Sequence, residues 1–336
     1  MLSVLARWAL TLVLLACTHL AVAAADNYPT GLAEFALVDP VEGGPMSGVA
    51  IYPAKAQGPP TQRGPFTIEA TADAPPATGR FPLILMSHGT GGSSLSHHDS
   101  MTALARAGFV AAAVEHPRDN FRDDSGFGTD LQLIGRPHHI VALTDGVLAH
   151  AAIGGIIDRS RIGMAGHSAG GYTALLVAGA VPNFKLIEEY RKAVPFDFYR
   201  SRADTVANFR RKPGLDVVAD PRVRAIFVMA PALGYVFDRH ALSKVQIPVK
   251  LYRPSADELL PHPWDAERIA GMLPRKPEYD LVERAGHFVF LAPCSAALAV
   301  LAPPICTDPP GVDRLAVHQR LNAEMIAFFR RTLAVK

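Results

Sequence analysis

The chain has 336 residues, which suits one large α/β domain or two small ones and is ample for a sizeable core. Hydrophobic residues make up 49% and charged residues 19% of it, a balance that excludes an intrinsically disordered protein. The formal net charge is only +2, and basic residues are interleaved with acidic ones. We therefore expect no nucleic-acid partner.

Residues 1–25 have the composition of a secretory signal peptide. Arg7 supplies a positive charge, residues 8–17 are apolar, and Ala-x-Ala choices for cleavage follow within 21–25. The apolar stretch is too short to span a membrane. We expect cleavage near Ala25, a single domain over residues 26–336, and a secreted or periplasmic location without a stable transmembrane segment.

An alternative reading of the same segment is a lipoprotein. Leu14, Leu15, Ala16 and Cys17 resemble a bacterial lipobox, in which Cys17 would be lipidated and would tether the protein to a membrane. Leu15 is not the usual residue at its position, and a second cleavage site follows. The soluble form is therefore favoured.

Beyond the leader, the hydrophobic pattern predicts an α/β fold. Two β-like patches at residues 34–38 and 48–52 predict an antiparallel strand pair, and the Gly- and Pro-rich stretches at 58–64 and 73–79 predict turns or loops. Apolar strands are then expected at 81–87, 109–115, 161–167, 225–229, 249–252 and 279–283. Helices are expected at 97–107, 137–152, 172–180, 264–272 and 313–333. Alternating buried strands and helices indicate a mostly parallel sheet covered on both faces.

One segment interrupts this alternation. Residues 182–221 lie between two core elements and mix aromatic side chains with Lys and Arg. Their spacing predicts short helices, and we interpret the insertion as a lid over the active site. The alternative is a solvated insertion that packs on the body without touching substrate.

Residues 162–172 contain the pattern Gly166-x-Ser168-x-Gly170. A serine on a sharp strand-to-helix turn exposes its hydroxyl above the sheet, and side chains at the flanking positions would clash. The pentapeptide alone is weak evidence. Its context is stronger, because an apolar run precedes it and an Ala- and Leu-rich stretch follows. Ser168 is therefore predicted to be a nucleophile.

Such a serine needs a base and a carboxylate that orients the base, in the chain order serine, acid, histidine. His287 follows directly after the last expected strand, at the sheet edge where open α/β folds carry their chemistry. Asp257 lies on the loop after the strand at 249–252 and is the expected acid. Its neighbour Glu258 is the rival.

Backbone amides are expected to bind the oxyanion. One donor should be Ala169, which follows the nucleophile, and the second should come from the glycine-rich loop at residues 88–92. We assign the second to Thr90, with Gly89 as the rival. His88 is expected to brace this loop.

Cys294 and Cys306 remain after removal of the leader. In an oxidising compartment, two cysteines so close in a proline-rich stretch predict a disulfide that pins a loop. The alternative is a pair of free buried thiols. The histidines and cysteines lack the spacing of a zinc site, so we expect no metal and no cofactor.

These motifs resemble the α/β-hydrolases related to dienelactone hydrolase and platelet-activating factor acetylhydrolase. The similarity is carried by residues 81–92, 107–117 and 166–171, and residues 285–294 resemble the histidine region of the bacterial secreted branch. It extends over roughly residues 80 to 330 and implies an α/β-hydrolase fold. Mammalian acetylhydrolases have their acid where this chain has Met229 and Ala230. Dienelactone hydrolase uses a cysteine where this chain has Ser168.

The resemblance implies hydrolysis of a small-molecule or lipid-like carboxylic ester through an acyl-enzyme. The aromatic insertion and the apolar loops favour an apolar acyl or aryl group. A set of arginines in the insertion could bind a phosphate or carboxylate head, although scattered arginines are typical of a solvated face; they are Arg191, Arg200, Arg202, Arg210 and Arg211. The alternative functions are acyl transfer to an alcohol and non-catalytic ligand binding on a hydrolase fold. The oligomeric state is left open.

Overall fold

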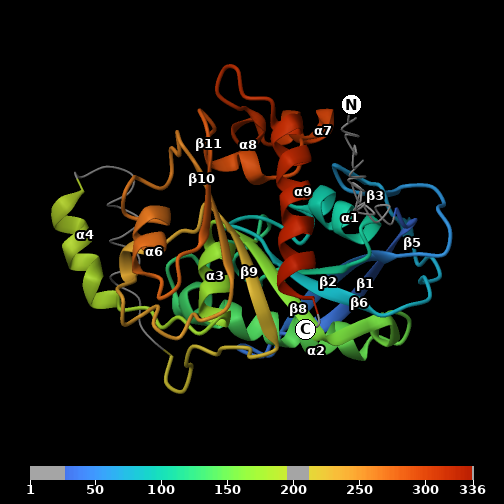
Figure 1. Cartoon of the computed structure of the whole chain (residues 1–336), viewed down its shortest axis with the longest axis horizontal. Helices are drawn as coiled ribbons and strands as arrows, with labels where there is room; N and C mark the ends of the chain where they lie inside the picture. Colours follow the sequence, from blue (N-terminus) through green and yellow to red (C-terminus); the bar gives the residue numbers. More distant parts are fainter. Residues whose placement is uncertain (1–26, 195–211, 335–336) are drawn as a thin grey trace, which may run out of the picture.

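The computed structural model describes residues 27–194 and 212–334. Within them, a nine-stranded sheet has the order β11-β10-β9-β8-β6-β7-β2-β1-β5 (Figure 1). Its strands are β1 (Thr30–Val38), β2 (Pro45–Pro53), β5 (Thr71–Ala72), β6 (Phe81–Ser87), β7 (Val110–Val114), β8 (Ile157–His167), β9 (Val223–Met229), β10 (Val249–Pro254) and β11 (Glu278–Val282). In the part of the sheet that runs from β11 through β10, β9, β8 and β6 to β7, every pair of neighbouring strands is parallel. The antiparallel pair β1–β2 extends the sheet, as predicted, and β2 joins β7.

The central strands are continuously apolar because both faces of the sheet are buried. Along β6, Leu83 and Leu85 belong to one core cluster, whereas Ile84 and Met86 belong to the other. Successive side chains of a strand point to opposite faces, so this alternation follows from the pleat. A strand covered on one face only would show a polar residue at every second position.

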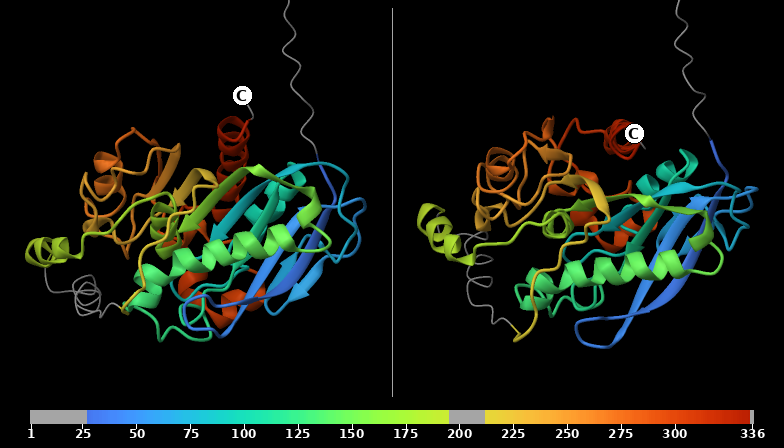
Figure 2. Two further views of the ribbon diagram at one scale, coloured as in Figure 1. Left: turned by 90° about the horizontal axis from the view of Figure 1, so that it is seen from below. Right: turned by 60° about the horizontal axis from the view of Figure 1, so that its bottom comes forward.

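Helices cover the two faces. Helix α2 (Arg136–Ala149) and helix α3 (Ala169–Val177) pack on one face, and their apolar side chains join the first cluster. Helix α1 (His98–Arg106) and helix α9 (Arg314–Thr332) pack on the other, with the second cluster. Figure 2 shows α2 and α9 on opposite sides of the strands. The predicted α/β-hydrolase architecture of a mostly parallel sheet between helices is confirmed.

Shorter elements complete the described part. They are the β3–β4 hairpin (Thr61–Arg63 and Phe66–Ile68), the short π-helix Leu131–Gly135, the 3₁₀ helices Gly154–Ile156, Phe184–Leu186, Gly234–Val236 and His287–Phe290, and the helices α4 (Ile187–Ala193), α6 (Ala266–Met272), α7 (Ala296–Leu301) and α8 (Pro303–Cys306). The prediction of turns or loops at 58–64 was wrong for residues 61–63, which pair with residues 66–68 as strands. Three residues are too few to show a hydrophobic period.

The insertion at 182–221 is described only in part. Its first portion contains the short helix α4, in which Ile187 and Tyr190 are buried. The ring of Tyr190 stacks on Tyr235, with 4.2 Å between the ring centroids. Residues 195–211 lie outside the described residues, as do Phe196, Phe198, Tyr199 and Phe209 of the predicted lid. The lid function therefore stays a prediction.

Cys294 and Cys306 form the predicted disulfide, with an S–S distance of 2.04 Å. It links the start of α7 to the end of α8. The leader at residues 1–25, including Cys17, lies outside the described residues. Over residues 27–194 and 212–334, no helix combines the length and the hydropathy needed to cross a membrane.

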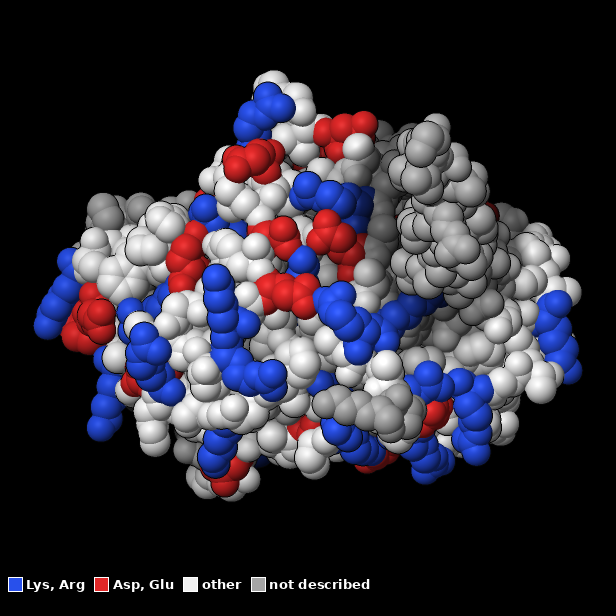
Figure 3. All heavy atoms as spheres, viewed as in Figure 1, with Lys and Arg blue, Asp and Glu red and all other residues white. Residues whose placement is uncertain are grey.

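Acidic and basic side chains are intermingled on the face seen in Figure 3. Ion pairs connect neighbouring elements. Lys250 of β10 lies 3.2 Å from Glu324 of α9, and Arg331 of α9 lies 2.5 Å from Glu278 of β11. The exposed pair of Arg331 and Glu278 contributes little to stability. The apolar contacts of α9 with the second cluster bury Leu321, Met325, Phe328 and Phe329.

Several histidines are buried near the carboxyl ends of the parallel strands. Burial lowers the pKa of His97 to about 4, against the opposite effect of nearby Asp99. Burial also holds the pKa values of His88, His116 and His167 well below their ordinary range. These side chains are therefore neutral in the folded protein at pH 7.

The packing of α9 generates the first prediction. Phe329 is fully buried against Gly163 and the rings of Phe227 and Phe328. Phe329→Ala should lower the free energy of unfolding by about 3–5 kcal/mol, because it removes apolar contacts and leaves a cavity. Urea denaturation measures this change. Leu315→Ala, at a 59% exposed position of the same helix, is the matched control and should change the value by less than about 0.5 kcal/mol.

The buried histidines generate the second prediction. The unfolded chain protonates its histidines below about pH 6.5, whereas the folded chain protonates His97 only near pH 4. The unfolded state thus binds more protons in this window, and stability should fall as pH falls from 6.5 towards 4. His97→Gln should make this dependence shallower by about 1.4 kcal/mol per pH unit.

Urea denaturation at half-unit steps between pH 8 and pH 4.5 measures the dependence. His240→Gln, at an exposed position, is the control and should leave the slope unchanged. An equal slope in wild type and His97→Gln would contradict the assignment of His97 as a buried neutral group.

Candidate active site

Ser168 occupies the tight turn between β8 and α3, in a backbone conformation that side chains rarely adopt (φ 55°, ψ −119°). The flanking glycines make this turn possible. A Cβ at Gly166 would lie 2.2 Å from the carbonyl oxygen of Gly170, and a Cβ at Gly170 would lie 1.9 Å from the carbonyl oxygen of Ser87. Neither contact is sterically allowed, so the pattern Gly-x-Ser-x-Gly follows from packing.

Backbone hydrogen bonds fix the turn against the end of β9. The Ser168 amide donates to the carbonyl of Met229 at 2.9 Å. The Ser168 carbonyl accepts from the amides of Ala232 and Tyr172, each at 3.1 Å. The strained residue is therefore held from both sides, as a strained position must be if it is to persist.

His287 and Asp257 are brought together from the loops that follow the last two strands. His287 Nδ1 donates to Asp257 Oδ2 at 2.9 Å, and both side chains are buried. Asp257 Oδ1 also accepts the amides of Leu259 and Leu260, each at 2.9 Å. A neutral imidazole that donates from Nδ1 to a carboxylate keeps the lone pair of its Nε2 free to accept a proton.

Glu258 has a different partner from its neighbour. Its Oε2 accepts the backbone amide of His287 at 2.8 Å. The approach is close, because a Cβ at Gly286 would lie 2.7 Å from the same oxygen. Asp257 thus holds the ring of His287 and Glu258 holds its backbone, which favours Asp257 over Glu258 as the acid.

His167, the residue before Ser168, contacts His287. The rings of His167 and His287 have centroids 4.7 Å apart, and His167 Nε2 donates to the His287 carbonyl at 3.1 Å. Among the described residues there is no hydrogen bond between the Ser168 hydroxyl and the His287 ring. In unliganded enzymes such bonds are often long or poorly aligned and tighten when substrate binds.

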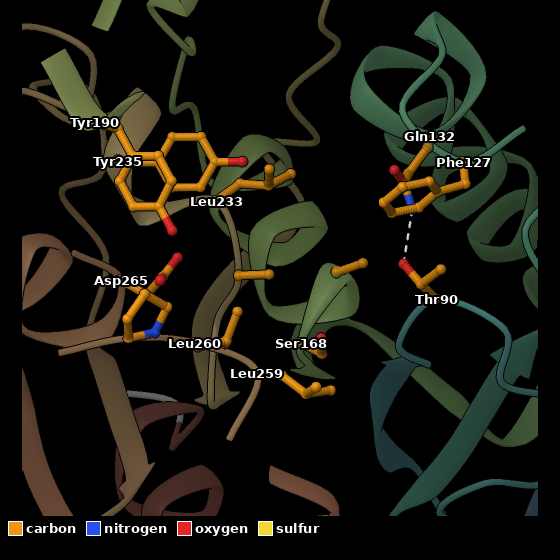
Figure 4. Close-up of a pocket in the computed structure, with 13 residues that line it drawn as sticks. Thr90, Phe127, Gln132, Ser168, Tyr190, Leu233, Tyr235, Leu259, Leu260 and Asp265 are labelled. Carbon is orange, nitrogen blue, oxygen red and sulfur yellow. Dashed lines mark hydrogen bonds between the residues drawn. The ribbon is translucent and has the colours of Figure 1, made fainter. Parts of the chain in front are cut away.

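The predicted oxyanion donors lie beside Ser168. Thr90 and Ala169 line one pocket with Ser168 (Figure 4). Ala169 is the first residue of α3, where a helix amide has no intrahelical acceptor. The Thr90 amide has no acceptor within the described residues. The rival Gly89 passes near the nucleophile, since a Cβ there would lie 3.2 Å from Ser168 Cβ, but Gly89 does not line the pocket.

The rest of the pocket is largely apolar and aromatic. In Figure 4 the stacked rings of Tyr190 and Tyr235 lie on one side of Ser168, and Thr90 and Gln132 lie on the other. Leucines 233, 259 and 260 line the space between. Asp265 also lines it, and its Oδ1 accepts the Gly234 amide at 2.9 Å.

A buried polar network beneath residues 88–92 was missed by the sequence reasoning. Its centre is an ion pair between Arg136 Nη1 and Asp119 Oδ2 at 3.0 Å, with both side chains 1% exposed. Burial raises the pKa of Asp119, against the opposing charge of Arg136. Burial lowers the pKa of Arg136. The only signal in the sequence was Arg136 at the start of an apolar helix. A charged residue at that position is equally typical of a solvent-exposed helix end.

Among the described residues, no group of three or more His, Cys, Asp and Glu side chains is placed to hold a metal ion.

His88 donates from Nδ1 to the Gly89 carbonyl at 2.7 Å and accepts the His116 amide at Nε2, at 3.1 Å. It therefore braces the loop, in agreement with the expectation for this residue.

Comparison with known proteins extends these observations. No curated protein matches the chain significantly. A solved structure of a ferulic acid esterase from Streptomyces cinnamoneus is similar, with a TM-score of 0.63 and 20% identity. The match covers 93% of this chain and 92% of that one. The model of the Alpha/beta hydrolase family matches residues 84–300, which include the serine turn, Asp257 and His287. The chain belongs to the Alpha/beta hydrolase family.

Proposed function

We propose that the protein is a secreted serine esterase that cleaves carboxylic esters through an acyl-enzyme. One observation carries the proposal. The turn that fits only glycine at positions 166 and 170 puts Ser168 in the lining of a pocket. Its neighbour His167 has its ring centroid 4.7 Å from that of His287, which is paired with Asp257. Family membership and the likeness to a ferulic acid esterase support the same reaction class.

In the first step, Ser168 Oγ attacks the ester carbonyl carbon while His287 Nε2 takes the hydroxyl proton. The carbonyl oxygen becomes an oxyanion that accepts hydrogen bonds from the amides of Thr90 and Ala169. The C–O bond of the ester then breaks, and the proton on His287 passes to the leaving alkoxide. Asp257 keeps the ring oriented and stabilises its positive charge.

In the second step, His287 takes a proton from water, whose oxygen attacks the acyl carbon. The bond to Ser168 breaks, the serine recovers its proton, and the acid leaves. This sequence requires no metal and no cofactor. If an alcohol enters in place of water, the product is a new ester, so product analysis with added alcohol distinguishes hydrolysis from acyl transfer.

The lining of the pocket supports an apolar or aryl acyl group. Leucine side chains and the Tyr190–Tyr235 stack give the pocket an apolar and aromatic lining, which suits a flat hydrophobic group. The subgroup related to dienelactone hydrolase and platelet-activating factor acetylhydrolase remains our proposal. Export from the cytoplasm is also part of our proposal, and the disulfide between Cys294 and Cys306 is compatible with it.

Removal of the nucleophile should abolish the reaction. Ser168→Ala should lower kcat for p-nitrophenyl acetate by about 10⁴- to 10⁶-fold, because no covalent intermediate can form. The variant should also resist labelling by a fluorophosphonate. Its thermal midpoint should stay close to that of the wild type. Unchanged turnover in a folded Ser168→Ala protein would sink the mechanism.

The two neighbouring acids should separate in the same assay. Asp257→Asn should lower kcat by about 10³- to 10⁴-fold, because an amide favours the wrong tautomer of His287. Glu258→Gln keeps an oxygen for the His287 amide and should lose less than about tenfold. The opposite ranking of the two variants would assign the acid to Glu258.

A further inference from the structure

The oxyanion loop, residues 88–92, is held from below by charged and polar side chains of residues 119–136. Arg136 is fully buried at the start of α2. Its Nη1 donates to Asp119 at 3.0 Å, and its Nη2 donates to Ser87 Oγ at 3.2 Å and to the His88 carbonyl. One guanidinium therefore connects the end of β6 to the carboxylate.

Gln132 connects the same carboxylate to the tip of the loop. Its Nε2 donates to Asp119 Oδ2 at 3.0 Å and to Thr90 Oγ1 at 2.7 Å, the bond drawn in Figure 4. Its Oε1 accepts the Gly128 amide at 2.9 Å, so the carboxamide cannot flip without losing these bonds. At the far end of the loop, the Gly92 carbonyl accepts the Phe121 amide at 3.0 Å.

These contacts use the side chain of Thr90 and the carbonyls of the loop, but they leave the Thr90 amide without an acceptor in the described part of the chain. The hydroxyl of Thr90 is fixed on the Gln132 side. Thr90 itself lines the pocket with Ala169 and Ser168. The bond at its side chain restricts the orientation of residue 90 relative to that pocket. A loop rich in glycine would otherwise sample many orientations at little cost.

Stability alone does not account for the network. Burying an ion pair removes two charges from water, and apolar residues of similar volume often stabilise a core equally well or better. Catalysis does depend on donors that are already aimed at the developing charge. We propose that Gln132, which bonds Thr90 directly, and Arg136, which bonds the same Asp119 carboxylate and the end of β6, are positioning residues that aim the Thr90 amide at the oxyanion. This inference rests on the proposed esterase function.

The size of the effect follows from the role. Loss of one oxyanion donor lowers kcat by about 10²- to 10³-fold, and a donor that is only less well aimed should cost about 10- to 100-fold. KM should change little, because the bond strengthens only in the transition state. A group that merely contacts bound substrate would change KM instead.

The test compares each ester with its thionoester, in which sulfur replaces the carbonyl oxygen. Sulfur accepts hydrogen bonds weakly, so a well-aimed oxyanion donor favours the oxygen ester. Gln132→Met and Thr90→Val should each lower kcat for the oxygen ester by about 10- to 100-fold and reduce its advantage over the thionoester. The double variant should lose no more than either single one, because the two groups act as a unit.

Conservative and control variants complete the design. Thr90→Ser keeps the hydroxyl and should stay within about threefold of wild type. Arg136→Lys keeps the charge but cannot reach three acceptors at once, so its kcat should fall as in Gln132→Met. If Arg136→Lys unfolds, the Gln132 and Thr90 variants still test the inference. Thr129→Val removes a hydroxyl bonded only to the nearby Gly126 carbonyl and should leave both rates unchanged.

Two outcomes would overturn the inference while leaving the esterase function intact. One is an unchanged ratio of ester to thionoester rates in folded Gln132→Met and Thr90→Val. The other is a rise in KM alone. By contrast, a wild-type protein that neither hydrolyses esters nor reacts with a fluorophosphonate would overturn the proposed function, and the inference with it.

Discussion

The closest approach in the site is the contact between the start of α3 and the end of β6. At Gly170 the α-carbon lies so near the Ser87 carbonyl that no other side chain fits. This approach forces the chain to turn sharply at Ser168 and sets the direction of α3. It also brings Ser168 close to the loop that follows β6, where a Cβ at Gly89 would lie 3.2 Å from Ser168 Cβ. The position of Ser168, the start of the helix and the proximity of residues 88–92 are thus consequences of one steric constraint.

The electrostatic surroundings of the site divide into two parts. On the side of His287, the neighbouring His167 and His97 are neutral because burial holds their pKa values down. On the side of the oxyanion loop, Arg136 keeps its charge and is paired with Asp119. In the proposed mechanism, neutral imidazoles near His287 avoid like-charge repulsion when that residue takes a proton. Beneath residues 88–92, the charge of Arg136 is balanced by that of Asp119.

The pocket joins these parts with an apolar surface. It is built from the loop after β6, the start of α3, the loops after β9 and β10, and α4 from the insertion. The carboxyl ends of parallel strands meet at one edge of a sheet, so loops distant in sequence come together there. Substrate selection can then vary with these loops while the strained turn beneath them stays the same.

The sequence by itself determined the fold class, the strands from residue 81 onward and the serine turn. It did so because buried strands, amphipathic helices and glycine at sterically closed positions depend on local patterns. The positions of Asp257 and His287 after successive strands were also readable, since chain order places them at one sheet edge.

Only the tertiary structure showed that Asp257 pairs with the ring of His287 and Glu258 with its backbone amide, because two adjacent carboxylates have the same sequence signature until their partners are known. It alone revealed the network of Arg136, Asp119 and Gln132, which joins positions that no short-range pattern relates. Local propensities reflect the backbone conformation that a residue favours next to its neighbours along the chain. Buried ion pairs and close backbone contacts arise between segments that meet only when the sheet forms.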